Sequence, residues 1–271
     1  MAVKKGQPIR DRRTQLLRDL VRNSYEQSFV VARYTTVGLW PAEEILALEH
    51  IPDQARILDL GCGAGRCAIA LAELGLEVVG VDLSRAMVEA ARFQAELAEV
   101  KVDFQVMDAM NLELQTESFE VVICAYNGLE LLPGIAGKKK ALAEVWRVLK
   151  PGGCFIFSSH SLFALNYFAP HRFLAFLRLC LGKVGWPMRE KELGERFIDD
   201  EWEEAKYLQI LPPSTWKKLL RMAGFELVYF NTRQRLETRK KWGIAGNFED
   251  GERFYVASKR GIPALQERPT S

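Results

Sequence analysis

Several features that would place a chain in a special class are missing from this sequence. No uncharged apolar run reaches eighteen residues, so no transmembrane helix is expected. The N-terminal stretch MAVKKGQPIRDRRTQ lacks the apolar core of a secretory signal, which makes a cytoplasmic location the default expectation. Lys and Arg number 37 against 35 Asp and Glu, and the resulting net charge of +2 gives no chain-wide field for holding a polyanion.

Paired cysteine motifs are also missing. The five cysteines are odd in number and show no CxxC spacing, so the sequence predicts neither a disulfide framework nor a zinc site, and no metal is expected. They are interpreted as reduced, mostly buried, small apolar side chains. These residues are Cys62, Cys67, Cys124, Cys154 and Cys180.

What the chain does contain is typical of a folded protein of one or two domains. It has 271 residues, of which 48% are hydrophobic and 27% charged, and it shows no internal repeat or low-complexity tract. From residue 56 strand and helix signals alternate, which predicts a doubly wound α/β fold with a mostly parallel sheet covered on both faces. Strands are expected at 56–60, 76–81, 102–107, 119–125 and 154–158, helices at 67–74, 84–98 and 138–149, and a turn at 150–153.

The alternation lapses after residue 159 and resumes about fifty residues later. We predict four parts: a helical N-terminal extension (1–52), a core (53–160), a lid or substrate-wall insertion (161–212) and a C-terminal part (213–271). The last part is expected to supply a helix at 214–223 and strands at 225–230 and 253–258. Because ligands of open α/β sheets bind beyond the carboxyl ends of the strands, substrate specificity is expected to reside in the two additions.

A glycine-rich loop is the most informative stretch. In ILDLGCGAGR (57–66), a strand runs into three glycines at alternate positions and then into a helix whose first N–H groups lack partners. Asp82 follows Gly61 by 21 residues, at the end of the next strand, where a carboxylate can accept both hydroxyls of a ribose. The pattern predicts a nucleoside pocket. Arg66 stands where the third glycine of a dinucleotide turn should lie, which argues against NAD or FAD.

With these motifs, residues 56–159 resemble the class I S-adenosylmethionine (SAM)-dependent methyltransferases. The resemblance rests on ILDLGCGAG, on Asp82 after the second strand, on QVMDAMNL, on SFEVVICAYNGLELL and on EVWRVLKPGGCFIFSSHS, in this order. It implies a Rossmann-like, seven-stranded sheet with one antiparallel strand. It also implies SAM as cofactor, with S-adenosylhomocysteine as its product.

The resemblance further implies which residues contact the cofactor. The loop would cradle the methionyl end, Asp82 would take the ribose, the following residue would pack on the adenine, and Asp108 would accept from the adenine amino group. Purely structural roles stay open for three of these residues: Asp59 can hold the glycine loop, Cys62 can pack in the core, and Asp108 can be a turn residue. The expected cofactor-binding residues are Asp59, Gly61, Cys62, Gly63, Gly65, Asp82, Leu83, Asp108, Ala109 and Tyr126.

Catalysis calls for alignment and for a base. Tyr126, after the fourth strand, is expected to line the methyl-transfer site, and Tyr34 and Trp40 could close over it, although core packing explains all three as well. His160, in FSSHS, is the candidate catalytic base, and a structural histidine bonded to loop backbone is the competing interpretation. Asn127 and Glu130 could orient a substrate or merely cap and solvate. His50 and His171 carry less weight.

The acceptor is predicted to be a small molecule methylated at O or N. An RNA substrate is the alternative, because the first 24 residues hold seven Lys or Arg and residues 233–241 are basic, but the acidic stretch 198–204 offsets this charge. A non-catalytic SAM-binding protein and an NAD-dependent oxidoreductase are weaker alternatives. The catalytic DPPY-type tetrapeptide of DNA amino-methyltransferases is replaced by AYNG. The oligomeric state is left open.

The Phe- and Leu-rich segment 161–181 has three interpretations: a lid that walls the substrate site, a membrane-surface helix with Arg172, Arg178 and Lys183 at lipid head groups, or a helix packed on the sheet. The lid is favoured because the basic face is sparse.

Overall fold

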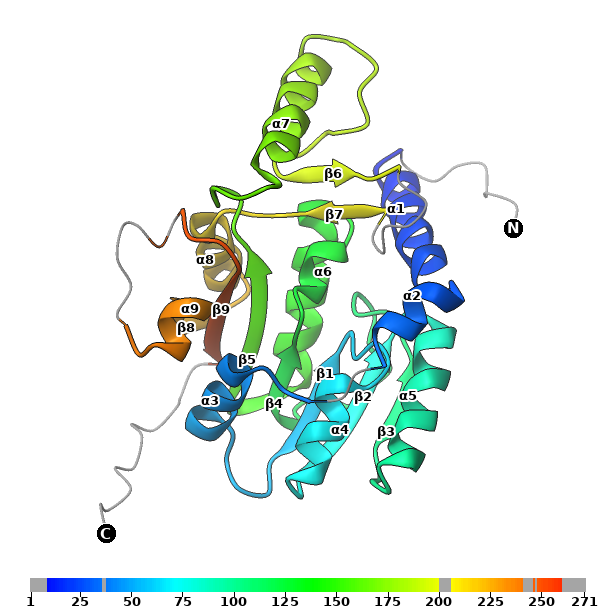
Figure 1. Ribbon diagram of the computed structural model, residues 1–271, viewed down its shortest axis with the longest axis vertical. Coiled ribbons are helices and arrows are strands. Elements are labelled where there is room, and N and C mark those ends of the chain that lie inside the picture. The colour runs from blue at the N-terminus through cyan, green and yellow to red at the C-terminus, as the bar shows by residue number, and fades with distance from the viewer. Residues whose placement is uncertain (1–8, 36–37, 200–205, 241–245, 247, 260–271) are drawn as a thin grey trace.

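A seven-stranded, mostly parallel sheet forms the centre of the protein (Figure 1). The computed structural model describes residues 9–35, 38–199, 206–240, 246 and 248–259. The strand order is β3-β2-β1-β4-β5-β9-β8, and β9 is the one strand of this sheet that runs antiparallel to its neighbours. The strands are β1 (Arg56–Leu60), β2 (Glu77–Asp82), β3 (Asp103–Val106), β4 (Phe119–Cys124), β5 (Leu149–His160), β8 (Phe225–Thr232) and β9 (Glu252–Lys259). The predicted Rossmann-like α/β sheet is therefore confirmed.

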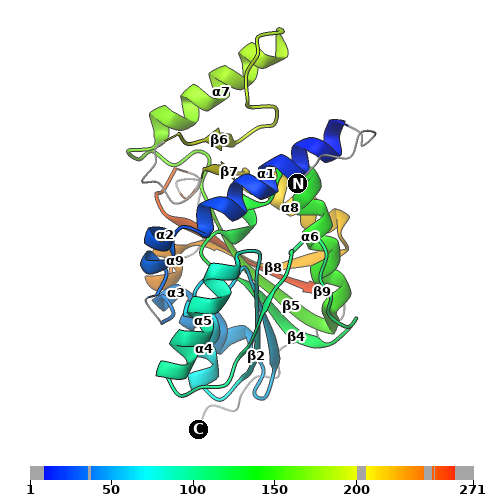
Figure 2. The ribbon, with the colours of Figure 1, turned by 90° about the vertical axis from the view of Figure 1, so that its right-hand side faces the viewer.

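Helices cover both faces of the sheet, as Figure 2 shows with the sheet nearly edge-on. Ile57, Val121 and Ile156 point to one face, whereas Leu58, Val122 and Phe155 point to the other, as the two-residue period of a strand requires. Side chains of α3 (Pro41–His50), α4 (Arg66–Glu73) and α5 (Arg85–Leu97) fill the first face. Those of α6 (Gly134–Val148) and α8 (Pro213–Met222) fill the second.

The start of β5 differs from the prediction. We expected a turn at 150–153 before a strand at 154–158, but β5 begins at Leu149, which already pairs with Phe119 of β4. The glycines are accommodated inside the strand by a shift of register after Phe119, with Gly152 at φ +82°. A bulged strand satisfies the turn-forming residues without interrupting the ladder.

The N-terminal extension contains α1 (Ile9–Tyr25), α2 (Ser28–Arg33) and α3. α1 and α2 lie near the carboxyl ends of the parallel strands, whereas α3 packs on one face of the sheet (Figure 2). Two contacts fix the extension to the start of α5: Ser84 Oγ donates to Tyr25 O at 3.0 Å, and the Glu26 carboxylate accepts from the Arg85 N–H at 2.8 Å. Ser84 also caps α5 by accepting from the Met87 N–H, as predicted. A carboxylate at a helix N-terminus favourably meets the helix dipole.

The insertion after β5 carries α7 (Ala169–Lys183) and a two-stranded ribbon of β6 (Glu195–Phe197) and β7 (Tyr207–Gln209). In Figure 1 the ribbon lies above the sheet, and α7 projects beyond the ribbon at the top of the molecule. Acidic residues 200–204 of the predicted offsetting stretch lie outside the described residues. The described strands of the main sheet come from 56–160 and 225–259, while the exact part boundaries stay a prediction.

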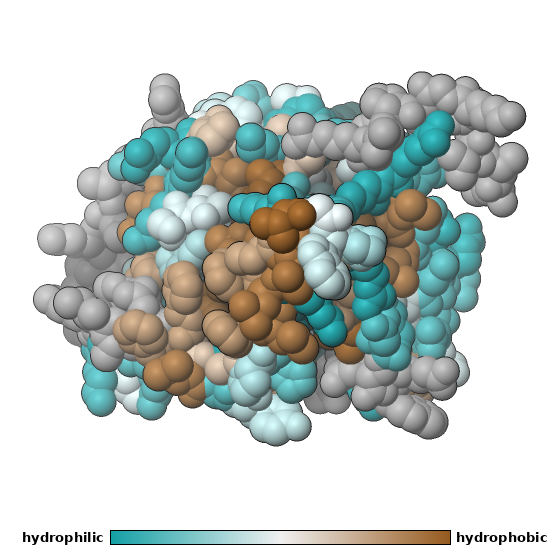
Figure 3. Space-filling view, turned by 90° about the horizontal axis from the view of Figure 1, so that it is seen from above, coloured by the Kyte–Doolittle hydropathy of each residue, from teal (hydrophilic) through white to brown (hydrophobic). Residues whose placement is uncertain are grey.

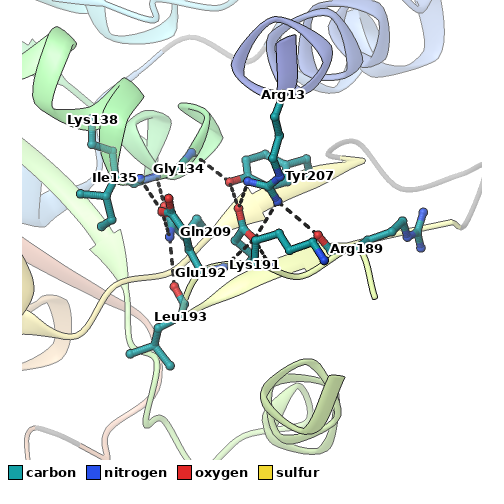
Figure 4. Close-up of polar contacts among 11 residues, drawn as sticks. Arg13, Gly134, Ile135, Lys138, Arg189, Lys191, Glu192, Leu193, Tyr207 and Gln209 are labelled. Carbon is teal, nitrogen blue, oxygen red and sulfur yellow. Dashed lines mark hydrogen bonds and ion pairs between the residues drawn. The ribbon is translucent and has the colours of Figure 1, made fainter. Parts of the chain in front are cut away.

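A buried polar cluster ties the ribbon to α1 and α6 (Figure 4). Arg13 of α1 donates to both carboxylate oxygens of Glu195 at 2.9 Å, and the Tyr207 hydroxyl donates to the same carboxylate at 3.0 Å. Lys138 of α6 donates to Gln209 Oε1 at 3.0 Å, and burial lowers the pKa of its ammonium group to about 7. The base of the insertion is therefore bonded to two elements of the remaining fold. None of the helices within the described ranges is long and apolar enough to cross a membrane.

Candidate active site

A cavity of about 340 Å³ opens at the carboxyl ends of β1, β2 and β4, and we call it the cofactor cavity. This is where an open α/β sheet offers helix N-termini and loops to a ligand. Nine of the ten residues predicted to bind cofactor line it. They are Asp59, Gly61, Cys62, Gly63, Asp82, Leu83, Asp108, Ala109 and Tyr126.

The glycine loop forms one wall of this cavity. The Gly61 and Cys62 N–H groups both donate to Val81 O, at 2.8 and 3.0 Å, which pulls the loop against the end of β2. Gly61 has φ +76°, and a Cβ placed there would find no atom within 4 Å, so it would project into open space at the cavity. Glycine here leaves room for a ligand and adopts a backbone conformation that other residues avoid.

Gly65 differs from its two neighbours because it does not line the cavity. It caps the N-terminus of α4 with φ +88°. A Cβ at this position would approach Ile69 Cδ1 to 2.9 Å and Phe104 Cζ to 3.0 Å. Close packing of α4 on the sheet therefore accounts for this glycine, whereas a contact with cofactor was predicted.

Asp59 is a buried carboxylate without a hydrogen-bond partner. Its residue is 1% exposed and neither carboxylate oxygen completes a hydrogen bond, although both lie on the cavity side of β1. Burial raises the pKa of Asp59 to about 7, against the opposing influence of the Arg66 charge and the nearby Ala68 N–H. Such a group is costly in a folded protein unless a cation or donor satisfies it. The predicted alternative, that Asp59 holds the loop, finds no completed bond here.

Asp82 and Asp108 already have partners inside the protein. Asp82 accepts from the Gly63 N–H at 2.9 Å and from the Ser84 N–H at 2.8 Å, so it braces the glycine loop, and burial raises the pKa of its carboxyl group. Asp108 accepts from the Met110 N–H at 2.8 Å and forms an ion pair with Arg18 of α1 at 3.0 Å. A carboxylate oxygen has more than one lone pair, so each can still accept from a ligand.

An aromatic group from the extension covers the cavity beside Tyr126. The Tyr126 ring lies 5.0 Å from that of Trp40 and 5.7 Å from that of Tyr34, measured between centroids. The Arg66 guanidinium lies over the Trp40 and Tyr126 rings and donates to both oxygens of the buried Glu43 at 2.7 Å. Tyr34 and Trp40 therefore lie beside Tyr126, and their closing over the methyl-transfer site stays a prediction.

The bidentate pair of Arg66 with Glu43 was not predicted, because these residues lie on different elements 23 positions apart. Its only sequence signal was the arginine that replaces a dinucleotide glycine.

A second cavity of about 820 Å³, which we call the acceptor cavity, adjoins the first. Tyr25, Tyr34 and Tyr126 line both cavities and form a common wall. The acceptor cavity extends from the end of β5 to the inner side of α7, where Leu174, Ala175 and Arg178 face it. The predicted insertion and extension thus both contribute to its wall.

His160 lies in the acceptor cavity and has a partner that the sequence did not reveal. Its Nδ1 lies 2.9 Å from Glu130 Oε2, and its Nε2 lies 3.3 Å from Asn127 Nδ2. Glu130 is 2% exposed and also accepts from Ser159 Oγ at 2.8 Å. Burial lowers the pKa of His160, but the charges of Glu130, Glu252 and Asp250 and the Glu130 hydrogen bond outweigh it and raise the pKa above its ordinary value.

Asn127 and Glu130 were predicted as substrate-orienting or capping residues, and both line the acceptor cavity and contact the histidine. Asn127 follows Tyr126 in a sharp turn where both residues have positive φ. His171 also lines the acceptor cavity, whereas His50 packs on the ring of Tyr229 at the far end of α3.

Comparisons with known proteins agree with this arrangement. Residues 57–153 match a family model described as a methyltransferase domain. Residues 57–153 therefore carry a methyltransferase domain, and the sheet around them has the class I, Rossmann-like fold. A ubiquinone biosynthesis O-methyltransferase from Coxiella burnetii is 31% identical over 103 residues, 38% of this chain and 42% of that protein. One from Xanthomonas oryzae is 35% identical over 106 residues, 39% of this chain and 43% of that protein.

The chain therefore spans less than half the length of these curated relatives. A solved SAM-dependent methyltransferase from Methanosarcina mazei superposes with a TM-score of 0.63 at 22% identity, covering 82% of this chain and 99% of the other. Likeness at this identity concerns the fold alone.

The residues of the cofactor cavity fit SAM, the cofactor of this family. SAM carries an ammonium group, ribose hydroxyls and an adenine amino group. The buried Asp59 carboxylate has no hydrogen-bond partner and could take the ammonium group. Asp82, at the end of β2, could take the ribose hydroxyls, and Asp108, after β3, could take the adenine amino group. Gly61 leaves open space between them. The aromatic rings of Tyr34 and Tyr126 at the border of the two cavities suit a sulfonium cation.

Proposed function

We propose that this protein transfers the methyl group of SAM to an oxygen or nitrogen atom of a small molecule bound in the acceptor cavity. The observation that carries the proposal is the common wall of Tyr25, Tyr34 and Tyr126, with the His160–Glu130 pair on the acceptor side. The O-methyltransferases named among the relatives also favour a small acceptor. The cytoplasmic location stays a prediction.

His160 is the proposed base. When bound, SAM supplies a methyl carbon already activated by its sulfonium, so the chain must chiefly align the acceptor and remove its proton. With Nδ1–H donated to Glu130, the lone pair on Nε2 can take the proton of a hydroxyl or amine. Glu130 then stabilises the imidazolium and holds the ring in place. The contact of Asn127 Nδ2 with Nε2 is long, at 3.3 Å, so an acceptor hydroxyl can displace the amide group.

The acceptor is proposed to bring its own hydrogen-bond donors. Asn127 Oδ1 and Glu190 Oε1 are buried, border the acceptor cavity and have no hydrogen-bond partner within the described residues. Glu190 faces Arg178 at 3.6 Å, too far for a hydrogen bond. Hydroxyl or amino groups on a substrate would satisfy both oxygens, and apolar side chains such as Phe168 and Leu174 would contact the rest of it.

The RNA alternative receives less support from the positions of the basic residues. Arg13 and Arg18 of α1 form ion pairs with Glu195 and Asp108, and Arg235 of the C-terminal basic cluster pairs with Glu249. Side chains held by carboxylates are poorly placed to bind phosphates. The small-molecule acceptor is therefore the function we propose.

Replacement of His160 tests the proposed chemistry. His160→Ala should reduce kcat by about a hundredfold or more, in the range that a general base contributes, and leave the Kd of SAM unchanged. Thr35→Ala, a change on the exposed side of the extension, is the matched control. If His160→Ala turns over the true acceptor at the parent rate, the proposed base is wrong.

The acceptor class can be tested without knowing the substrate. Purified protein is incubated with methyl-labelled SAM and a cell extract separated into small molecules and RNA. We expect label in the small-molecule fraction, lost with His160→Ala. Label confined to RNA would contradict the proposal.

A further inference from the structure

The helix α7 exposes a row of apolar side chains to solvent. Phe173, Phe176, Leu177 and Cys180 recur at helical spacing on its outer side, and we call them the outer stripe. Phe173 is 62% exposed and Phe176 48%. The opposite side of the helix is buried through Arg172, Ala175 and Leu179. In Figure 1, α7 lies beyond the ribbon of β6 and β7, so its buried side faces the ribbon and not the main sheet.

More apolar side chains flank the stripe at both ends of the helix. Leu165 and Tyr167 precede α7 and are 77% and 82% exposed, and Val184 and Trp186 follow it at 74% and 60%. Figure 3, which views the molecule from the side of α7, shows apolar residues gathered in the middle of this face. An exposed apolar area of this extent on one projecting element marks a contact surface.

The charge of the same segment indicates which class of partner would bind the outer stripe. Residues 161–189 contain four Lys or Arg and no Asp or Glu, although acidic residues are frequent in the chain. Lys183 lies exposed one turn beyond the outer stripe, and Arg178 is 42% exposed on the neighbouring side of the helix. Apolar rings with cations and without carboxylates suit the boundary between acyl chains and anionic head groups. Trp186 and Tyr167 are residue types that favour this boundary.

The position of α7 relative to the acceptor cavity points the same way. Leu174 and Arg178 lie between the outer stripe and the cavity, and both line the cavity. A surface that contacts the outer stripe would therefore lie beside the wall of the acceptor cavity. The lid and membrane interpretations of this segment are thus compatible, because they use different sides of one helix.

We propose that α7 docks in the plane of an anionic lipid surface, with the outer stripe in contact with the acyl chains and Lys183 at the head groups. The helix lies on the bilayer and does not cross it. This inference concerns binding and does not depend on the proposed methyl transfer.

Vesicle binding of the full chain tests the proposal. The protein is sedimented with phosphatidylcholine vesicles and with vesicles in which about a third of the lipid is phosphatidylglycerol. We expect binding to the anionic vesicles, weaker binding to neutral ones, and a loss of at least about tenfold in Phe173→Glu/Phe176→Glu. Phe93→Glu is the matched control, because Phe93 is 57% exposed on α5, and it should bind like the parent.

Thermal unfolding without lipid shows whether each variant is folded. Vesicle binding is compared with that of the parent for the variants that have the same melting temperature as the parent. Lys183→Glu gives a second readout that leaves the apolar stripe intact, with an expected several-fold loss on anionic vesicles only. The proposal is overturned if the parent binds neither vesicle, or if the double variant binds as well as the parent. It is equally overturned if light scattering finds a dimer that the double variant abolishes, because the stripe then joins two copies.

Discussion

The two cavities of this protein differ in how the chain builds them. The cofactor cavity takes its main walls from four strand ends and the loops after them, between residues 59 and 133, with a cover from the extension. The acceptor cavity combines the end of β5, the turn at Tyr126, the extension, the insertion and the segment before β9. One site is encoded mostly by local motifs, and the other is assembled from distant segments. The first is therefore readable in a sequence, and the second is not.

The largest expected effect concerns Asp59. Asp59→Asn should weaken SAM binding about a hundredfold, because it removes a buried carboxylate that pairs with a cation. With a pKa of about 7, the carboxyl is protonated in acid and must lose its proton to bind a cation. The affinity of the parent should therefore rise with pH up to about 7 and level off above it. Calorimetric titration at several pH values measures this, and an equally steep rise in Asp59→Asn would contradict the assignment.

The same substitution should stabilise the ligand-free protein. Asp59 has a pKa raised above its ordinary value of 3.8, so ionising it costs folding free energy, and stability falls as pH rises from about 4 to 7. Asp59→Asn should gain about 2 kcal/mol in free energy of unfolding above pH 7, after the cost of a buried amide. Denaturant titration at pH 5 and 8 measures the difference. No gain at pH 8 would show that Asp59 has a partner in the ligand-free protein.

A change at the base of the insertion should affect the acceptor cavity alone. Arg13→Gln leaves the buried Glu195 without its cation and should cost about 2 kcal/mol of stability. KM for the acceptor should rise while the Kd of SAM stays unchanged, because Arg13 does not line the cofactor cavity. The exposed Arg189 pairs with Asp199 in the same insertion, so Arg189→Gln is the control and should be neutral. If Arg13→Gln raised the Kd of SAM as much as the KM for the acceptor, the two cavities would not be independent.

Gly61 and Gly75 offer a matched test of the cofactor cavity. Both have positive φ and open space beyond the position of a Cβ, but only Gly61 lines the cavity. Each change to Ala should cost about 1 kcal/mol of stability from backbone strain. Only Gly61→Ala should also weaken SAM binding, by about tenfold, through the methyl group that enters the cavity. Similar SAM affinity in the two variants would place the cofactor elsewhere.

The smallest expected effect concerns the histidine pair. Because Glu130 raises the pKa of His160, kcat should rise with pH through a pKa above 6.5. Glu130→Gln should move this acid limb to lower pH and lower the plateau several-fold through looser positioning of the ring. Glu252→Gln, which removes a weaker charge without a hydrogen bond, should move it less. If the pH profile is unchanged in Glu130→Gln, the pH dependence of kcat does not arise from His160.

Prediction from sequence succeeded where neighbours in the chain are neighbours in the site. The Gly61 turn and the cap at Ser84 both follow from short-range patterns. It failed where a contact joins distant segments, because neither the pair of Arg66 with Glu43 nor that of His160 with Glu130 leaves a local pattern. For Gly65 the sequence could not separate the two roles, because packing against Phe104 and contact with a ligand require the same residue type.

The most direct measurement of the central claim is calorimetric titration of the full chain with S-adenosylhomocysteine, with NADH as the comparison. We predict saturable binding of one S-adenosylhomocysteine per chain, weakened in Gly61→Ala and retained in Gly75→Ala, and no heat with NADH. Folded protein that gives no heat with S-adenosylhomocysteine, or that binds NADH instead, would contradict the account.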